Sequence, residues 1–120
     1  MTVGHVRDNF PRVSLTLPGR SKPILVEFLI DTGFEGELSL PQLVADQVEA
    51  EFFANRPVRL GDGSLRQRPA YKFVLEWDEE ARLTEILILE NTPLLGVELL
   101  AGSLLQLEMQ DGGEVQIEPL

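Results

Sequence analysis

Apolar and polar side chains alternate along much of the chain, as they do in β-strands that bury one face. Residues 13–17 alternate in this way before a turn at Pro18-Gly19. Residues 71–77 alternate again and, with the return of apolar residues over 83–89, predict a hairpin. A second strand pair is predicted over residues 105–117, where two alternating stretches flank an Asp-Gly-Gly turn.

Three other segments complete the pattern of elements. Residues 24–30 are apolar except for Glu27, which predicts a strand that is buried on both faces. Short helices are predicted over residues 41–50 and 97–101. Closely spaced strands with one or two short helices favour an all-β sandwich or barrel. Because no repeat or linker is found, residues 1–120 are predicted to form one domain.

The composition excludes several classes of function. The 120 residues include no cysteine and one histidine, His5, so we expect neither a thiolate or multi-histidine metal site nor a Ser-His-Asp triad. A net charge of −10 opposes binding to nucleic acid and to anionic membrane surfaces. No apolar run is long enough to cross a bilayer, and the N-terminus lacks the apolar core of a signal peptide. We therefore expect a cytoplasmic protein.

One carboxylate stands where an apolar strand meets a turn. Asp31 follows residues 24–30 and precedes Thr32 and Gly33. Burial there makes ionisation of Asp31 costly unless N–H groups or a partner share its proton. Thr32 can fix the loop by hydrogen bonding to the backbone, and Gly33 permits a tight turn and the close approach of a ligand. Taken alone, the tripeptide is more typical of an ordinary turn.

A second motif follows downstream of this turn. Residues 86–89 are apolar, Thr92-Pro93 breaks the strand, and Leu94-Leu95-Gly96 opens a short helix. Together with Asp31-Thr32-Gly33, in this order and spacing, the motif resembles the retroviral-type (retropepsin-like) aspartic proteases. It looks particularly like their small single-domain bacterial relatives. The resemblance covers the chain from about residue 13 to residue 109.

The resemblance implies a retropepsin-like fold, a closed β-barrel or sandwich, in which the chain is one half of a homodimer. Asp31 of each subunit would meet at the two-fold axis, and the pair would activate a water that hydrolyses a peptide or unfolded protein, without a metal or cofactor. Thr32 would hydrogen-bond across the axis, and Gly33 would offer backbone N–H groups to the carboxylates. The residues implied to contact the substrate are Phe34, Gly61, Asp62, Gly63, Leu95 and Gly96.

The hairpin predicted over residues 58–65 lies between the two motifs in the sequence and corresponds to an element of the family that it resembles. Its Asp62-Gly63 turn is a common hairpin turn, and the resemblance implies that it is the flap that closes over the substrate. An ordinary hairpin tip explains these two residues as well. Arg66 and Arg68 follow the turn and could meet an acidic substrate, although exposed arginines on a hairpin are usually only solvated.

The chain departs from the retroviral pattern at several positions. Phe34 replaces a small residue, which makes the wall beside the catalytic loop bulkier, and Glu35 stands where acidic or polar residues are common. Val97 and Glu98 replace an arginine and a polar residue, so the salt bridge from that arginine to the region after the catalytic loop is expected to be absent. An acidic residue at the position of Glu98 is common in the bacterial relatives.

Other interpretations stay open on the sequence alone. A catalytically silent dimer of the same fold could hold a peptide strand by main-chain pairing. A plain β-barrel could carry the triplet by chance. The terminal strands over 104–109 and 115–118 and the N-terminal stretch are candidates for dimer contacts, although such alternation is also typical of core strands. Trp77 and Tyr71 are expected in the core, and His5 is expected to have no specific role.

Overall fold

Ten β-strands and two one-turn helices form the fold of this chain, whose computed structural model describes residues 1–120. The prediction of an all-β protein with one or two short helices is confirmed. In chain order the elements are β1 (Thr2–Arg7), β2 (Phe10–Leu17), β3 (Ile24–Ile30), β4 (Leu38–Leu40), α1 (Gln42–Ala45), β5 (Glu51–Arg59), β6 (Leu65–Trp77), β7 (Glu80–Ile88), β8 (Leu94–Leu95), α2 (Val97–Leu100), β9 (Ser103–Leu107) and β10 (Glu114–Pro119).

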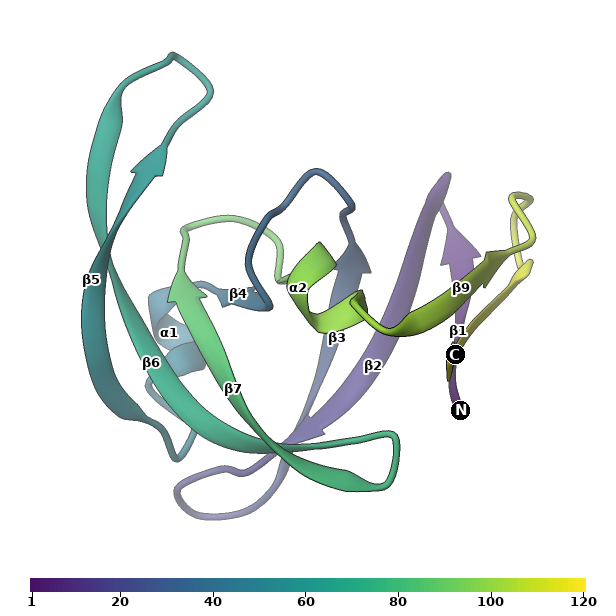
Figure 1. Cartoon of the computed structure of the whole chain (residues 1–120), viewed down its shortest axis with the longest axis horizontal. Coiled ribbons are helices and arrows are strands. Elements are labelled where there is room, and N and C mark those ends of the chain that lie inside the picture. Colours follow the sequence, from purple (N-terminus) through teal and green to yellow (C-terminus); the bar gives the residue numbers. More distant parts are fainter.

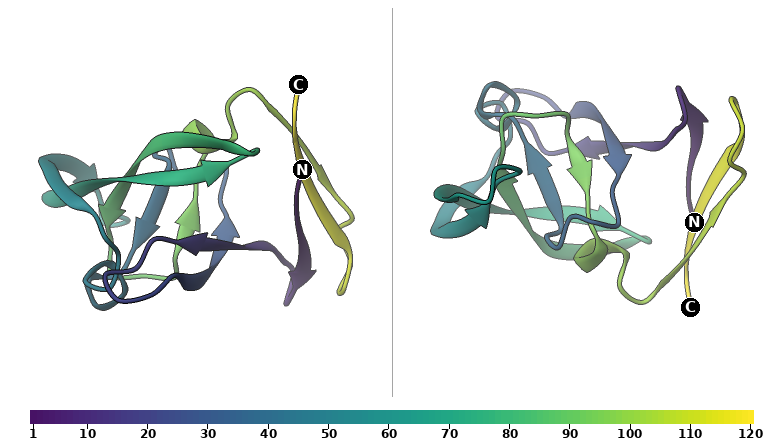
Figure 2. Two further views of the ribbon diagram at one scale, coloured as in Figure 1. Left: turned by 90° about the horizontal axis from the view of Figure 1, so that it is seen from below. Right: turned by 90° about the horizontal axis from the view of Figure 1, so that it is seen from above.

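All ten strands belong to one sheet, in the order β5-β6-β7-β4-β8-β3-β2-β1-β10-β9. Most neighbours are antiparallel, but β3 runs parallel to β8 and β4 parallel to β7. The sheet curls, and its two end strands lie on opposite sides of the molecule (Figures 1 and 2). The expectation of a closed barrel is therefore wrong. β5 extends outward with β6, and β9 pairs only with β10, so both outer edges stay open.

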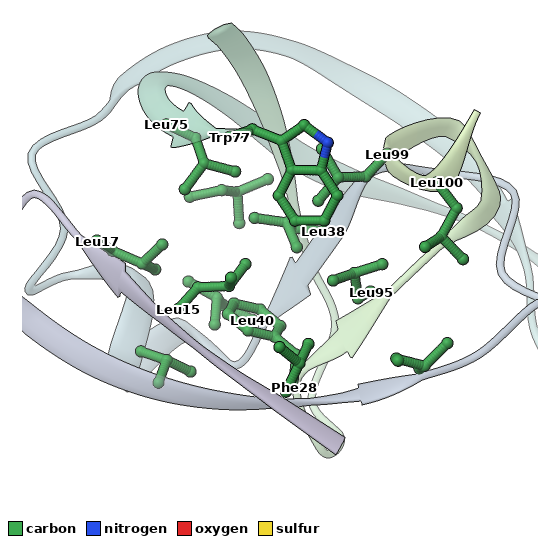
Figure 3. Close-up of a cluster of buried hydrophobic side chains, with 14 of the residues drawn as sticks. Leu15, Leu17, Phe28, Leu38, Leu40, Leu75, Trp77, Leu95, Leu99 and Leu100 are labelled. Atoms are coloured by element: carbon green, nitrogen blue, oxygen red, sulfur yellow. The ribbon is translucent and has the colours of Figure 1, made fainter. Parts of the chain in front are cut away.

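A single hydrophobic core fills the inside of the curled sheet. Its twenty buried side chains come from β1 to β4, β6 to β8, α2 and β10, with one from the loop after α1. Figure 3 shows that Phe28, Leu38 and Leu95, from three neighbouring strands, enter the same interior. Burying a side chain of this size contributes roughly 1.5–3 kcal/mol. Trp77 lies in the core as predicted, and Tyr71 packs at its margin.

Strand β3 is buried on one face rather than on both. Val26, Phe28 and Ile30 point inward, whereas Leu25 is 72% exposed on the outer face. No second layer covers that face, so Glu27 is free to pair there with Arg7, at 2.6 Å. The hydrogen bond from Arg7 lowers the pKa of Glu27. The sequence predicted burial of both faces because residues 24–30 are almost all apolar. An apolar side chain such as Leu25 can also lie on an exposed face, and the sequence alone does not distinguish the two cases.

The helices and the N-terminus also differ from expectation. The first helix ends at Ala45 rather than near Ala50, because Val48 bridges to Gly19 and β5 begins at Glu51. The N-terminal residues form strand β1, in which His5 is exposed. β1 pairs with both β2 and β10, so it belongs to the sheet. Neither four-residue helix has the length or apolar content to cross a membrane.

Two parts project from the body of the sheet. The β5–β6 hairpin rises on one side, and β1, β9 and β10 form an arm on the other (Figures 1 and 2). In β5 no side chain is buried, whereas all three residues of β4, at the centre of the sheet, are buried. The fold therefore places a packed centre between a hairpin whose β5 strand is exposed and an arm whose β1 and β10 strands still contribute side chains to the core.

Candidate active site

Strand β3 brings Asp31 to the centre of the sheet. The buried inner face of β3 fixes the strand and therefore the residue that follows it. The backbone N–H of Asp31 donates to the carbonyl oxygen of Leu95 at 2.9 Å, which continues the parallel pairing of β3 with β8. Asp31 is half-buried, whereas Thr32 and Gly33 are exposed. The carboxylate thus stands at the border between the core and solvent.

The Asp31-Thr32-Gly33 turn orients the carboxylate of Asp31. The backbone N–H of Gly33 donates to Oδ1 of Asp31 at 2.8 Å, and that of Phe34 donates to the Asp31 carbonyl oxygen at 3.1 Å. Oδ2 of Asp31 accepts no hydrogen bond within the chain. One oxygen is therefore held by the turn, and the other is available to a proton, a water or a second carboxylate.

The Leu94-Leu95-Gly96 segment lies directly beside this turn. Leu95 is buried in β8 between Ile30 of β3 and Leu38 of β4. A Cβ atom on Gly96 would stand 2.2 Å from the carbonyl oxygen of Gly36, which no side chain tolerates. Only glycine therefore lets the loop after Asp31 approach this closely. The structure thus brings together the two motifs that the sequence singled out.

A cleft of about 780 Å³ separates residues 33–38 from the β5–β6 hairpin. Gly33 and Phe34 line the end that adjoins Asp31, and Pro57 and Val58 line the hairpin side. Phe34 is half-buried and forms part of the wall, at the position for which the sequence implied substrate contact. The volume falls in the usual range for a ligand pocket, and its lining residues come from several strands.

Two ion pairs that the sequence did not indicate lie along this cleft. Arg82 of β7 contacts Glu37 at 2.8 Å and also donates to the carbonyl oxygen of Glu98 in α2. Glu37 in turn accepts the backbone N–H of Glu85 at 3.0 Å. The loop after Asp31 is thus tied to β7 and α2. An arginine from β7, rather than one from the segment after Gly96, therefore anchors this region.

The second ion pair joins the hairpin to β7. Arg56 of β5 contacts Glu85 at 2.7 Å, and this side-chain hydrogen bond raises the pKa of Arg56. Neither pair has a local sequence signal, because 45 residues separate Glu37 from Arg82 and 29 separate Arg56 from Glu85. The parallel register that sets Leu38 of β4 against Ile86 brings Glu37 and Glu85 together. Predicting that Glu37 and Glu85 meet would have required knowing that β4 pairs with β7.

The hairpin tip lies outside the cleft lining. Gly61, Asp62 and Gly63, implied as substrate contacts, occupy the turn between β5 and β6, beyond the residues that border the cleft. Asp62 accepts hydrogen bonds from the hydroxyl and the backbone N–H of Ser64, at 2.6 and 2.9 Å, and these lower the pKa of Asp62. Gly63 has a φ of +87°, which favours glycine. The hydrogen bonds of this turn are made among its own residues, which do not contact Asp31 within the single chain.

No cluster of three His, Cys, Asp or Glu side chains has the geometry to hold a metal ion. Comparisons with protein-family models, with curated proteins and with solved structures find no match to this chain. The functional argument therefore rests on the geometry of the site.

Proposed function

We propose that the chain is one half of a homodimeric, retropepsin-like aspartic endopeptidase in which Asp31 of each subunit supplies one carboxylate. The observation that carries this proposal is the contact between the two motifs. Asp31 follows a buried strand, its N–H donates to the carbonyl oxygen of Leu95, and Gly33, whose N–H is bonded to the Asp31 carboxylate, lines the cleft. In this proposal the β5–β6 hairpin is the flap over the substrate.

The chemistry requires two carboxylates held close together. Such a pair cannot ionise at both sites, so it shares one proton. The ionised member takes a proton from a water, whose oxygen forms a bond to the scissile carbonyl carbon, while the protonated member gives its proton to the carbonyl oxygen. When the C–N bond then breaks, the leaving nitrogen takes a proton from the pair, and the pair regains one from a hydroxyl of the tetrahedral intermediate. One chain contains a single Asp-Thr-Gly triplet, so the second carboxylate has to come from another copy.

The arm of β1, β9 and β10 supports the proposal of a dimer. β9 is an open edge strand, and edge strands are natural sites for pairing with a second chain. Leu107 and Met109, at and just beyond its end, are 37% and 59% exposed rather than part of the core. Both positions lie within the terminal stretch that the sequence indicated for dimer contacts. We propose that a second copy covers these side chains.

The proposal is tested by incubating the protein with an unfolded protein mixture and identifying new peptides by mass spectrometry. Asp31→Asn is the control, because asparagine keeps the side-chain oxygen that accepts the Gly33 N–H and should preserve the fold. We expect cleavage by the wild type alone, best at acid pH, and a dimer in sedimentation. A protein that is monomeric at every concentration, or equal cleavage by both proteins, would overturn the proposal.

A second candidate function is peptide binding without cleavage. The open edge of β5 borders the cleft and offers unpaired backbone groups to an extended peptide, which favours strand addition. A binding module of this kind would keep its ligand in Asp31→Asn and would cleave nothing as wild type. The same pair of proteins therefore separates the two functions.

A further inference from the structure

Charge is distributed very unevenly between the hairpin and the remainder of the chain. Residues 52–72 hold five of the ten Lys and Arg residues but only one of the twenty Asp and Glu residues. This segment therefore carries a charge of +4, and the other residues together carry −14. An acidic ligand is repelled by most of this surface and attracted along the hairpin.

Most of these cations share the face of the hairpin that borders the cleft. Arg56 and Val58 line the cleft, and the register places Arg68 directly opposite Arg56 and Arg66 directly opposite Val58. Directly opposite residues of an antiparallel pair project to the same side of the sheet. Lys72, on the same alternation as Arg66 and Arg68, also lines the cleft. Arg66 and Arg68 are not part of the cleft lining, but the register places them in a row of positive side chains on the same face of the hairpin as Arg56.

Four of the five cations, Arg59 included, have no acidic partner in the chain. Arg56 is neutralised by Glu85, but Arg66, Arg68 and Lys72 form no salt bridge. Lys72 instead places its Nζ 4.1 Å from the centre of the Phe53 ring. Arg66 and Arg68 occupy alternate positions on one face of β6 with no acidic partner, so their like charges repel one another. A bound anionic group on this face would relieve that repulsion.

The opposite wall of the cleft has the opposite charge. Glu35 and Glu98 line it and form no salt bridge, whereas Glu37 is held by Arg82. An extended peptide turns alternate side chains to opposite sides. A peptide lying between these walls therefore meets cations on one side and carboxylates on the other.

We infer that the site selects extended peptides with acidic side chains at the alternate positions that face the hairpin, and that Arg66, Arg68 and Lys72 read these side chains. The inference rests on the proposed function only in that the cleft receives an extended peptide. It assigns a substrate class to the cleft. It also gives a role to cations that lie outside the Asp31 turn.

The experiment measures binding to the Asp31→Asn protein, so that no peptide is cut. The probe is a fluorescein-labelled peptide with Glu at every second position and Val between, compared with the same peptide carrying Gln in place of Glu. We expect the Glu peptide to bind about tenfold more tightly at low salt, with the difference shrinking as NaCl is added. Arg66→Gln with Arg68→Gln should abolish the difference.

The matched control removes the same two charges elsewhere. Arg20→Gln with Lys22→Gln changes the loop between β2 and β3 and should keep the preference for the Glu peptide. Chemical unfolding of both double variants checks that each is folded. Equal binding of the Glu and Gln peptides to the unmodified cleft would overturn the inference, and so would a preference that survives the loss of Arg66 and Arg68.

The outcome is independent of whether the protein is an enzyme. If the wild type cleaves nothing but the Glu preference and its loss are observed, the endopeptidase proposal fails and the inference stands. If the wild type cleaves neutral and acidic peptides equally well, and the Asp31→Asn protein binds both equally, the inference fails and the endopeptidase proposal stands.

Discussion

The centre of the sheet and the β5–β6 hairpin are built in opposite ways. At the centre, every residue of β4 is buried. Asp31, at the end of β3, is held by a backbone hydrogen bond to Leu95 of β8, the strand between β3 and β4. In β5 no residue is buried, and the cations of the hairpin face outward or into the cleft. The carboxylate thus lies beside closely packed strands, whereas the hairpin across the cleft has fewer buried contacts to hold it in place.

This difference assigns separate tasks to the two regions. A reaction that depends on two carboxylates at a fixed separation needs a centre whose position is set by packing. A wall that admits and releases a long peptide needs few buried contacts, so that movement costs little. Substitutions at the centre should therefore act on stability and activity together, whereas those on the hairpin should act on ligand preference.

The largest contrast is expected from truncating one leucine in each region. Leu38 in β4 is fully buried, and Leu38→Ala should lower the free energy of unfolding by about 3 kcal/mol because it leaves a cavity. Leu65 in the hairpin is 62% exposed, and Leu65→Ala should change it by less than about 0.5 kcal/mol. Urea unfolding of both variants measures the difference, and similar losses would show that the hairpin is packed as firmly as the centre.

The next contrast uses two glycines. A Cβ at position 96 would meet the backbone oxygens of Gly36 and Phe34 at 2.2 and 2.5 Å, so Gly96→Ala should cost about 2 kcal/mol and displace the loop after Asp31. Gly61 at the hairpin tip has no atom within 4 Å of such a Cβ, and Gly61→Ala should be nearly neutral. Thermal unfolding with a cleavage assay checks both. An active, stable Gly96→Ala protein would contradict the described approach of the loop.

A smaller effect is expected from the ion pair that anchors the loop. Arg82→Gln removes the partner of Glu37, and because the pair is partly buried the loss should be about 1 kcal/mol. If Arg82 acts only by positioning the loop, kcat should fall while KM changes little. Arg56→Gln, which breaks the more exposed pair with Glu85, is the control and should spare kcat. A loss of kcat in both variants would argue against a special role for Arg82.

The smallest effect is expected when the pH is lowered, and it concerns the hydrogen bonds between Asp62 and Ser64 at the hairpin tip. The hydrogen bonds from Ser64 lower the pKa of Asp62, because they favour its ionised form. Their contribution to the stability of the turn is therefore fully present above the ordinary pKa of aspartate and is lost as the pH falls through the lowered pKa. Protection of the Ser64 amide against hydrogen exchange should follow this titration, and the amide of Leu29, bonded to Pro93 at the centre, should not. In Asp62→Asn the pH response of Ser64 should disappear.

Much of the fold could be predicted from the alternation of apolar residues. β3 matches the predicted bounds, and the helix at Val97 and the turn of the β6–β7 hairpin were predicted, although β6 begins at Leu65 rather than at Tyr71. The N-terminal strand was not predicted because several of its residues are polar. It forms by pairing with β10, which lies more than a hundred residues away in the sequence. Closure was wrongly expected because alternation within a strand does not determine which strands end up at the edges.

The site could be predicted only where its residues are consecutive. Asp31 and Gly96 lie in short motifs that the sequence singled out, and the pairing of β3 with β8 brings them together. Arg82 could not be found, because its link to Glu37 depends on the parallel register of β4 with β7. The hairpin tip was expected at the substrate, but in the single chain the cleft is lined by the strands below it.

The central claim is that two copies of Asp31 act as one catalytic unit. The most direct test mixes wild-type and Asp31→Asn subunits in varying proportions, allows them to exchange, and measures peptide cleavage at a fixed total concentration. A pair of carboxylates predicts that activity follows the square of the wild-type fraction, because a mixed dimer has only one aspartate. Activity that falls in simple proportion to the wild-type fraction, or wild-type protein that cleaves nothing, would contradict the account.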